Sequence, residues 1–156
     1  MVLYLDIDGV MVPANSWRRP NLLEDGFPEF SLNAVTALNM LIVELNATII
    51  LTTSHKNTYT LKEWKNIFKK RNVLVCEIDR LPKNTNNLNR KEELLQWLNK
   101  RRIKENFMII DDDKSLNGLP TFLKSRLIQT SGSVGLTVEL VNEALNSIDK
   151  SNYHVV

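Results

Sequence analysis

The fold is decided by residues 1–9, which read Met1-Val2-Leu3-Tyr4-Leu5-Asp6-Ile7-Asp8-Gly9. The short apolar run over residues 2–7 is typical of a buried β-strand, and two aspartates occur where it ends. Side chains alternate along a strand, so Asp6 and Asp8 would leave the same face and converge. Gly9 lets the backbone bend away sharply and leaves room above the carboxylates. The stretch therefore predicts a strand that delivers two converging carboxylates at its carboxyl end.

The same apolar, partly β-branched character returns at residues 47–53, 73–78, 107–110 and 127–129. The charged pair Asp79-Arg80 would mark the end of the strand at residues 73–78. Amphipathic helices are expected between the strands, and this alternation implies right-handed crossovers and a parallel sheet. We therefore predict an α/β fold, a three-layer sandwich with a mostly parallel, doubly wound sheet of about five strands.

Capping residues predict where three of the helices begin. These residues are Ser31, the pair Thr60 and Glu63, and the pair Asn89 and Glu92. A last helix is expected over residues 137–148, where apolar side chains recur at helical spacing. The basic triplet at residues 69–71 stands at a predicted helix end, where cations offset the helix dipole.

The composition is ordinary for a globular protein: 43% of the 156 residues are apolar, 24% are charged, and the formal net charge is +2. The length fits one domain, so residues 1–156 are predicted to form a single unit. The lone cysteine, Cys76, excludes an intramolecular disulfide and a thiolate metal cluster. No apolar run approaches a membrane span and no signal peptide is recognisable, so we expect a cytoplasmic protein without membrane association.

Residues 11–30 are predicted to form a short flap or cap-like insertion, because Pro13, Pro20, Gly26 and Pro28 interrupt any regular element. Within the insertion, Trp17-Arg18-Arg19 places an aromatic ring beside two guanidinium groups. Such a group could stack on a nucleobase and grip a phosphate. The alternative interpretation is an ordinary surface loop.

Polar residues follow two further predicted strands. One strand ends in Thr52-Thr53-Ser54 and another in Asp111-Asp112-Asp113. Because ligands bind beyond the carboxyl ends of parallel strands, these groups should meet Asp6 and Asp8. A cluster of carboxylates with retained waters suits Mg²⁺, particularly when a substrate phosphate completes the shell. A solvated acidic loop is the simpler interpretation of the triple aspartate taken alone.

These stretches resemble the motifs of the haloacid-dehalogenase-like (HAD) hydrolases. The first motif is matched by Leu3-Tyr4-Leu5-Asp6-Ile7-Asp8-Gly9-Val10, the second by Ile49-Ile50-Leu51-Thr52, and the fourth by Met108-Ile109-Ile110-Asp111-Asp112. The third, a basic residue near a helix start, is matched by Arg90 or Lys91. The stretches Leu127-Ile128-Gln129-Thr130 and Gly135-Leu136-Thr137 also resemble the HAD domain of bacterial RNA-repair assemblies.

The resemblance implies a HAD-like Rossmannoid sheet and a Mg²⁺-dependent phosphatase that works through an aspartyl phosphate. Asp6 would be the nucleophile, and Asp8 would protonate the leaving oxygen and then deprotonate water. We expect the acidic surroundings of Asp8 to favour the protonated state that its role requires. The metal would be held by Asp6, the Asp8 backbone carbonyl, and Asp112 or Asp111.

The resemblance also implies which groups hold the substrate. The phosphate oxygens would be bound by Arg90 or Lys91 and by a strand hydroxyl, for which Thr52 fits the family pattern better than Thr53. Gly9, Arg18 and Arg19 are further candidates for substrate binding.

The expected substrate is a phosphomonoester, and an open site under a short insertion would admit a bulky one such as a nucleic-acid end. A metal-dependent nuclease also gathers carboxylates at strand ends, and a non-catalytic phosphate-binding regulatory domain could share the fold. His55 could touch substrate or lie on the surface, and His154 in the tail is not expected to take part. The sequence does not specify an oligomeric state.

Overall fold

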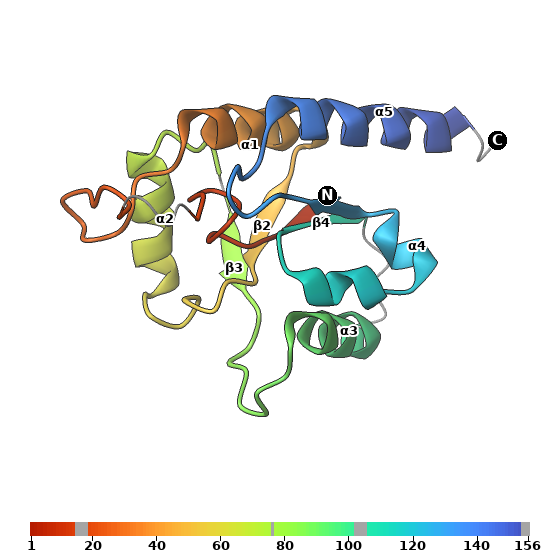
Figure 1. Cartoon of the computed structure of the whole chain (residues 1–156), viewed down its shortest axis with the longest axis horizontal. Helices are drawn as coiled ribbons and strands as arrows, with labels where there is room; N and C mark the ends of the chain where they lie inside the picture. The colour runs from red at the N-terminus through yellow and green to blue at the C-terminus, as the bar shows by residue number, and fades with distance from the viewer. Residues whose placement is uncertain (15–18, 76, 102–105, 154–156) are drawn as a thin grey trace.

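The computed structural model describes residues 1–14, 19–75, 77–101 and 106–153 (Figure 1). In these residues five parallel strands form one sheet in the order β3-β2-β1-β4-β5. The strands are β1 (Val2–Leu5), β2 (Thr48–Leu51), β3 (Ile78–Arg80), β4 (Phe107–Asp111) and β5 (Leu127–Gln129). The chain winds outward from β1 to β3 and then crosses back to β4 on the other side of β1. The predicted doubly wound α/β sheet is confirmed.

Helices cover both faces of the sheet (Figure 1). The bounds are α1 (Leu32–Leu45), α2 (Leu61–Lys70), α3 (Arg90–Arg101), α4 (Thr121–Lys124) and α5 (Val138–Tyr153), with a 3₁₀ turn η1 (Lys114–Gly118). Buried side chains of α1, α2 and α5 pack on one face, while those of α3, η1 and α4 pack on the other. Strand β1 supplies both layers, because Leu3 and Leu5 enter the first core and Val2 and Tyr4 the second.

The helices begin where local capping chemistry predicts. The Ser31 hydroxyl accepts a hydrogen bond from the Ala34 amide at 3.1 Å, just before α1. Thr60 and Glu63 form the complete capping box of α2, with bonds of 3.1 and 3.0 Å. Each of these capping residues bonds a group only three residues away, so the start of the helix does not depend on contacts with the rest of the fold.

The third strand lies later in the chain than predicted. The expected strand at residues 73–78 is replaced by β3 over Ile78–Arg80, so Asp79-Arg80 lies within the strand and does not end it. The backbone after α2 is used otherwise: the Val73 amide donates to the Phe68 carbonyl at 3.1 Å, and the Leu74 amide donates to the Asn39 side chain at 2.9 Å. The amides of Val73 and Leu74 are thus bonded to α2 and α1, and pairing with β2 begins later in the chain. Cys76 lies outside the described residues.

The other boundaries differ from the expected ones by a few residues. The first two strands end at Leu5 and Leu51, so Asp6 and Thr52 stand just beyond the ladder, and α5 runs on to Tyr153. Among the described residues, no helix combines the length and apolar character that a membrane crossing needs.

Arg71 ties the insertion to helix α2. Its guanidinium makes two bonds to the Asp25 carboxylate, of 2.7 and 2.9 Å, and it also donates to the carbonyls of Phe27 and Pro28. The same group lies 5.4 Å from the ring centre of Phe27 and 5.3 Å from that of Phe30. The side chain is buried, so Arg71 fixes the insertion in place and does not serve as a solvent-exposed helix-end cation.

Candidate active site

Three strand ends and one helix start meet at the carboxyl edge of the sheet. The Asp6 amide continues the ladder by donating to the Ile110 carbonyl at 3.0 Å, and the Thr52 amide donates to the Leu5 carbonyl at 2.9 Å. Asp111 is the last residue of β4. Backbone hydrogen bonds thus fix three polar residues at the point where the strand order reverses, between β1 and β4.

The carboxylates of Asp6, Asp111 and Asp112 form a compact acidic cluster. Each offers one oxygen, and these oxygens lie within 4.8 Å of one another. Asp6 and Asp111 are buried, and Asp112 is partly exposed. The geometry is that of a group that could hold a metal ion.

Two glycines make room for Asp112. A Cβ atom at Gly9 would collide with the Asp112 carboxylate, and one at Gly132 would lie 2.9 Å from its Oδ2 atom. Gly9 also has a φ of +78°, which side chains rarely tolerate. The first-motif glycine therefore permits both the turn and the close approach of the third carboxylate.

Arg90 enters the acidic cluster from the first turn of α3. Its Nη1 atom donates to Asp111 Oδ2 at 2.7 Å and to the Thr52 hydroxyl at 3.0 Å, and it lies 3.6 Å from Asp6 Oδ1. The Lys91 amide donates to the Ser115 hydroxyl at 3.2 Å, and the Lys91 ammonium lies beside Gly118. Of the two basic residues that the sequence left open, Arg90 is the one whose side chain joins Asp6 and Asp111.

Burial and mutual repulsion perturb these charges. Burial, followed by the charge of Asp111, raises the pKa of Asp6 to about 8. Burial likewise raises the pKa of Asp111, although Arg90 opposes this. For Arg90, burial works against the charged form, but Asp111, Asp6 and Glu93 outweigh it and raise the pKa. Without a cation, therefore, the acidic cluster retains a proton near neutral pH.

Thr52 and Thr53 are both buried but have different partners. The Thr52 hydroxyl accepts from Arg90, as described above, and so faces the acidic cluster. The Thr53 hydroxyl accepts a 3.3 Å bond from the His55 amide and closes the turn after β2. This arrangement favours Thr52 over Thr53 as the hydroxyl that faces a substrate.

Asp8 lies apart from the acidic cluster. Its side chain is 58% exposed, and its Oδ2 atom is 2.8 Å from His55 Nε2. We expected acidic surroundings for Asp8, but the side chain paired with it is an imidazole. The turn residues after Asp6 carry the second carboxylate outward, where it can meet a group arriving from solvent.

The remaining candidates are exposed or lie outside the described residues. Arg19 is exposed, whereas Trp17, Arg18 and His154 fall outside the part of the chain that the structure describes. Their proposed contacts with substrate stay predictions.

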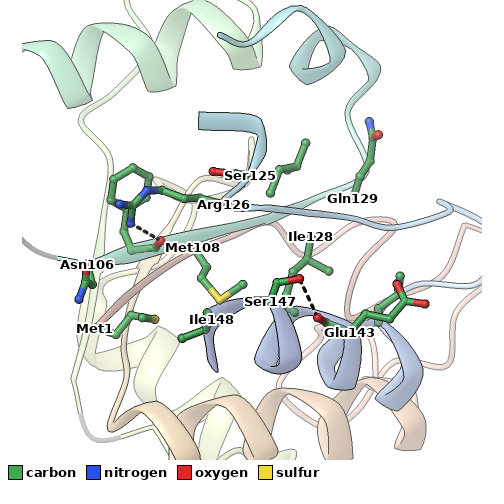
Figure 2. Close-up of a pocket in the computed structure, with 14 residues that line it drawn as sticks. Met1, Asn106, Met108, Ser125, Arg126, Ile128, Gln129, Glu143, Ser147 and Ile148 are labelled. Atoms are coloured by element: carbon green, nitrogen blue, oxygen red, sulfur yellow. Dashed lines mark hydrogen bonds between the residues drawn. The ribbon is translucent and has the colours of Figure 1, made fainter. Parts of the chain in front are cut away.

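A cavity of about 460 Å³ lies at the other end of the sheet (Figure 2). Its lining includes Met1, Asn106 and Arg126, which directly precede β1, β4 and β5. Asp6 and Asp112, in contrast, directly follow β1 and β4. The cavity is therefore distinct from the carboxylate site.

The sequence analysis did not predict the buried ion pair between Lys56 and Glu93, which lies beside Arg90. The Lys56 ammonium donates to Glu93 Oε2 at 2.9 Å, and Glu93 Oε1 lies 3.8 Å from Arg90 Nε. The spacing of Arg90 and Glu93 places both on one side of α3 and could have indicated their pairing. Nothing in the local sequence indicates that Lys56, from the turn after β2, would meet them.

Comparison with known protein families agrees with this geometry. The family described as the HAD domain in Swiss Army Knife RNA repair proteins matches residues 2–141, from the first residue of β1 into α5. No curated protein and no solved structure matches the chain. The match confirms the resemblance drawn from the strand-end motifs, and it spans every residue of the acidic cluster. The chain therefore belongs to the family of HAD domains found in Swiss Army Knife RNA repair proteins.

Proposed function

We propose that this HAD domain is a Mg²⁺-dependent phosphatase that hydrolyses phosphomonoesters with Asp6 as its nucleophile. Membership of the HAD family indicates a phosphohydrolase-type function. The observation that carries the finer proposal is the acidic cluster of Asp6, Asp111 and Asp112, with Arg90 and Thr52 beside it. This set combines a buried carboxylate nucleophile with oxygen ligands for a cation and two groups suited to phosphate oxygens.

The donor set fits a hard divalent cation. Three carboxylates against the one guanidinium of Arg90 leave the fully ionised cluster with an excess of two negative charges. Burial makes such an excess costly, so a divalent cation would balance the cluster where a proton otherwise must. When bound, the cation would neutralise the phosphate and reduce its repulsion from the attacking carboxylate.

We assign Asp6, Asp112 and the backbone carbonyl of Asp8 as the metal ligands. Both oxygens of Asp111 already have partners: Oδ2 accepts from Arg90 at 2.7 Å, and Oδ1 accepts from the Asp113 amide at 3.0 Å. Asp112 is partly exposed and lies against Gly9 and Gly132. Its oxygens are therefore better placed than those of Asp111 to bind a metal ion. Asp111 then serves to hold Arg90 and to complete the negative charge.

In the proposed reaction, a carboxylate oxygen of Asp6 forms a bond to phosphorus while the bond to the leaving oxygen breaks. Asp8 gives its proton to that leaving oxygen. Arg90 and Thr52 hold the equatorial oxygens, where charge stabilisation and positioning matter most for phosphoryl transfer. Water then attacks the phosphorus of the aspartyl phosphate, Asp8 takes a proton from it, and inorganic phosphate leaves Asp6.

His55 holds the Asp8 carboxyl group in position. Its Nε2 atom engages Asp8 Oδ2 at 2.8 Å, which fixes the carboxylate at the solvent side of the site. We assign the other oxygen, Oδ1, to the leaving group. A pure phosphate-binding domain would have no use for a second aspartate held in this way.

We propose a phosphorylated nucleic-acid end as the substrate. The family description refers to RNA repair proteins, and the reaction proposed above removes a phosphate. Arg19 on the insertion is exposed and carries the charge that a nucleic-acid backbone would attract. The insertion is short and anchored through Arg71, so a bulky substrate would not need to be enclosed.

The test is phosphate release from 3′- and 5′-phosphorylated oligonucleotides and from an aryl phosphate, with Mg²⁺ or with excess chelator. We expect release from monoesters only with the cation. Cleavage within the strand without phosphate release would instead identify a metal-dependent nuclease. Full activity in chelator would contradict the metal assignment.

A further inference from the structure

Arg90 is contacted from two sides. Its Nη1 atom faces the acidic cluster and Thr52, and its Nε atom faces Glu93 at 3.8 Å. Glu93 is one helical turn further along α3, and its other oxygen accepts the 2.9 Å bond from Lys56. The side chains of all three residues are at least 88% buried, since their exposures are 12%, 10% and 4% for Arg90, Glu93 and Lys56.

Three hydrogen bonds fix the backbone of Lys56. Its amide donates to the Thr53 carbonyl at 3.1 Å. Its carbonyl accepts from the indole of Trp64 at 3.0 Å and from the guanidinium of Arg80 at 2.9 Å. Two neighbouring elements, α2 and β3, therefore hold the turn that carries Lys56.

A buried lysine is expensive unless its charge is balanced, and stability alone does not explain why one is present. Apolar side chains of similar volume are often as stable as a buried ion pair. Lys56 balances Glu93, so Glu93 can face Arg90 without neutralising it completely. The Arg90 guanidinium then remains positive enough to attract the substrate phosphate, while Glu93 holds it in position from the side opposite the acidic cluster.

We propose that Lys56 and Glu93 are positioning residues that hold the Arg90 guanidinium in register with Asp6 and Thr52. This inference rests on the proposed role of Arg90 in binding the substrate phosphate. Arginine has several rotatable bonds, and loss of a group behind it would allow Nη1 to leave the site. A displacement of about 1 Å can cost on the order of a hundredfold in rate.

The test removes both charges together. In Lys56→Met/Glu93→Gln the side chains keep nearly the same volume, and neither partner is left buried alone. We expect a urea-unfolding midpoint close to that of the native protein and a kcat that falls about 10- to 100-fold, with a smaller rise in KM. The matched control is Lys62→Met/Glu92→Gln, which removes one exposed charge of each sign and should leave kcat unchanged.

A second variant covers the case in which the double variant does not fold. Glu93→Asp keeps the negative charge between Lys56 and Arg90 but draws the carboxylate back from both by one methylene. We expect the protein to fold, with kcat at least about fivefold lower. A native kcat in either folded variant would overturn the proposal, because Arg90 would then keep its position without Lys56 and Glu93.

A spectroscopic readout makes the inference independent of catalysis. The ¹⁵N relaxation of the Arg90 Nε–Hε group, identified by its loss in Arg90→Lys, should indicate a rigid side chain in the native protein. It should indicate a mobile one in Lys56→Met/Glu93→Gln. Equal rigidity in both would refute the positioning role. A native protein that hydrolyses no phosphomonoester would refute the proposed function, and the relaxation comparison would still decide the position of Arg90.

Discussion

At the scale of single residues, Asp6 and Asp8 have the same side-chain chemistry but opposite surroundings. Asp6 is buried beside Asp111, whereas Asp8 is exposed and paired with His55. A buried carboxylate held by the sheet suits attack at a fixed point, and an exposed one suits proton exchange with leaving group and water. The division of roles that we propose for the two aspartates therefore follows from where β1 ends.

Asp8→Asn should slow turnover in a way that depends on the leaving group. A poor leaving group needs a proton as its bond breaks, while an aryl oxide leaves without one. We expect a loss of about a thousandfold or more with an alkyl phosphate and about a tenfold smaller loss with an activated aryl phosphate. Steady-state kinetics on both substrates measure this. Equal losses on the two would show that Asp8 is not the proton donor.

Mg²⁺ affinity should increase with pH because the cation and a proton compete for Asp6. Burial and Asp111 raise the pKa of Asp6 to about 8 from an ordinary value of 3.8, so the folded metal-free protein binds the extra proton between these values. The proton bound to Asp6 stabilises the folded metal-free protein. In chelator, its contribution to the free energy of unfolding is lost as pH rises toward 8. With the cation, affinity should rise up to about pH 8 and then level off. Calorimetric titration with Mg²⁺ from pH 6 to 9 measures this affinity. Asp6→Asn should make the affinity nearly independent of pH.

Arg90 and Lys91 give a matched pair of variants from adjacent positions. Arg90→Lys keeps the charge, but one ammonium cannot replace a guanidinium whose Nη1 contacts Asp111 and Thr52 while its Nε faces Glu93. We expect kcat/KM to fall about a hundredfold, and Lys91→Met to stay within about twofold of the native value. Kinetics with an aryl phosphate measure both. The reverse order would reinstate Lys91 as the third-motif residue.

At the scale of elements, prediction succeeded where the signal was local. Ser31 and the box of Thr60 and Glu63 act on amides three residues away, so the sequence alone locates the starts of α1 and α2. Strand β3 was misplaced because Leu74 finds a partner in Asn39, 35 residues earlier. Apolar character at residues 73–75 could not indicate that these amides would be occupied by α1 and α2.

The anchor between the insertion and α2 should contribute substantially to stability. Arg71→Ala removes two bonds to Asp25, the bonds to the carbonyls of Phe27, Pro28 and Ile67, and the contacts with the rings of Phe27 and Phe30. We expect a loss of about 3 kcal/mol in the free energy of unfolding, and about 0.5 kcal/mol or less for exposed Lys70→Ala. Urea unfolding measures both. Equal effects would mean that the anchor is dispensable.

At the scale of the whole molecule, the strand order explains why the meeting of the strand-end carboxylates could be predicted from sequence. The reversal between β1 and β4 brings Asp6 and Asp111 to one edge, and both stand at the ends of apolar strands that are easily recognised. Lys56 and Glu93 could not be recognised, because their contact joins a turn after β2 to the first turns of α3. Reactive groups at strand ends are readable from sequence, whereas the residues that support them depend on the packing of helices against the sheet.

The central claim is that Asp6 becomes phosphorylated, and chemical trapping tests it most directly. In the proposed mechanism Asp8→Asn should slow release of the phosphate, so brief incubation with Mg²⁺ and a labelled aryl phosphate followed by acid quench should retain the label. We predict one phosphate on the peptide that contains Asp6, absent in chelator and absent from Asp6→Asn. Continued turnover by Asp6→Asn, or native turnover without label on this peptide at any quench time, would contradict the account.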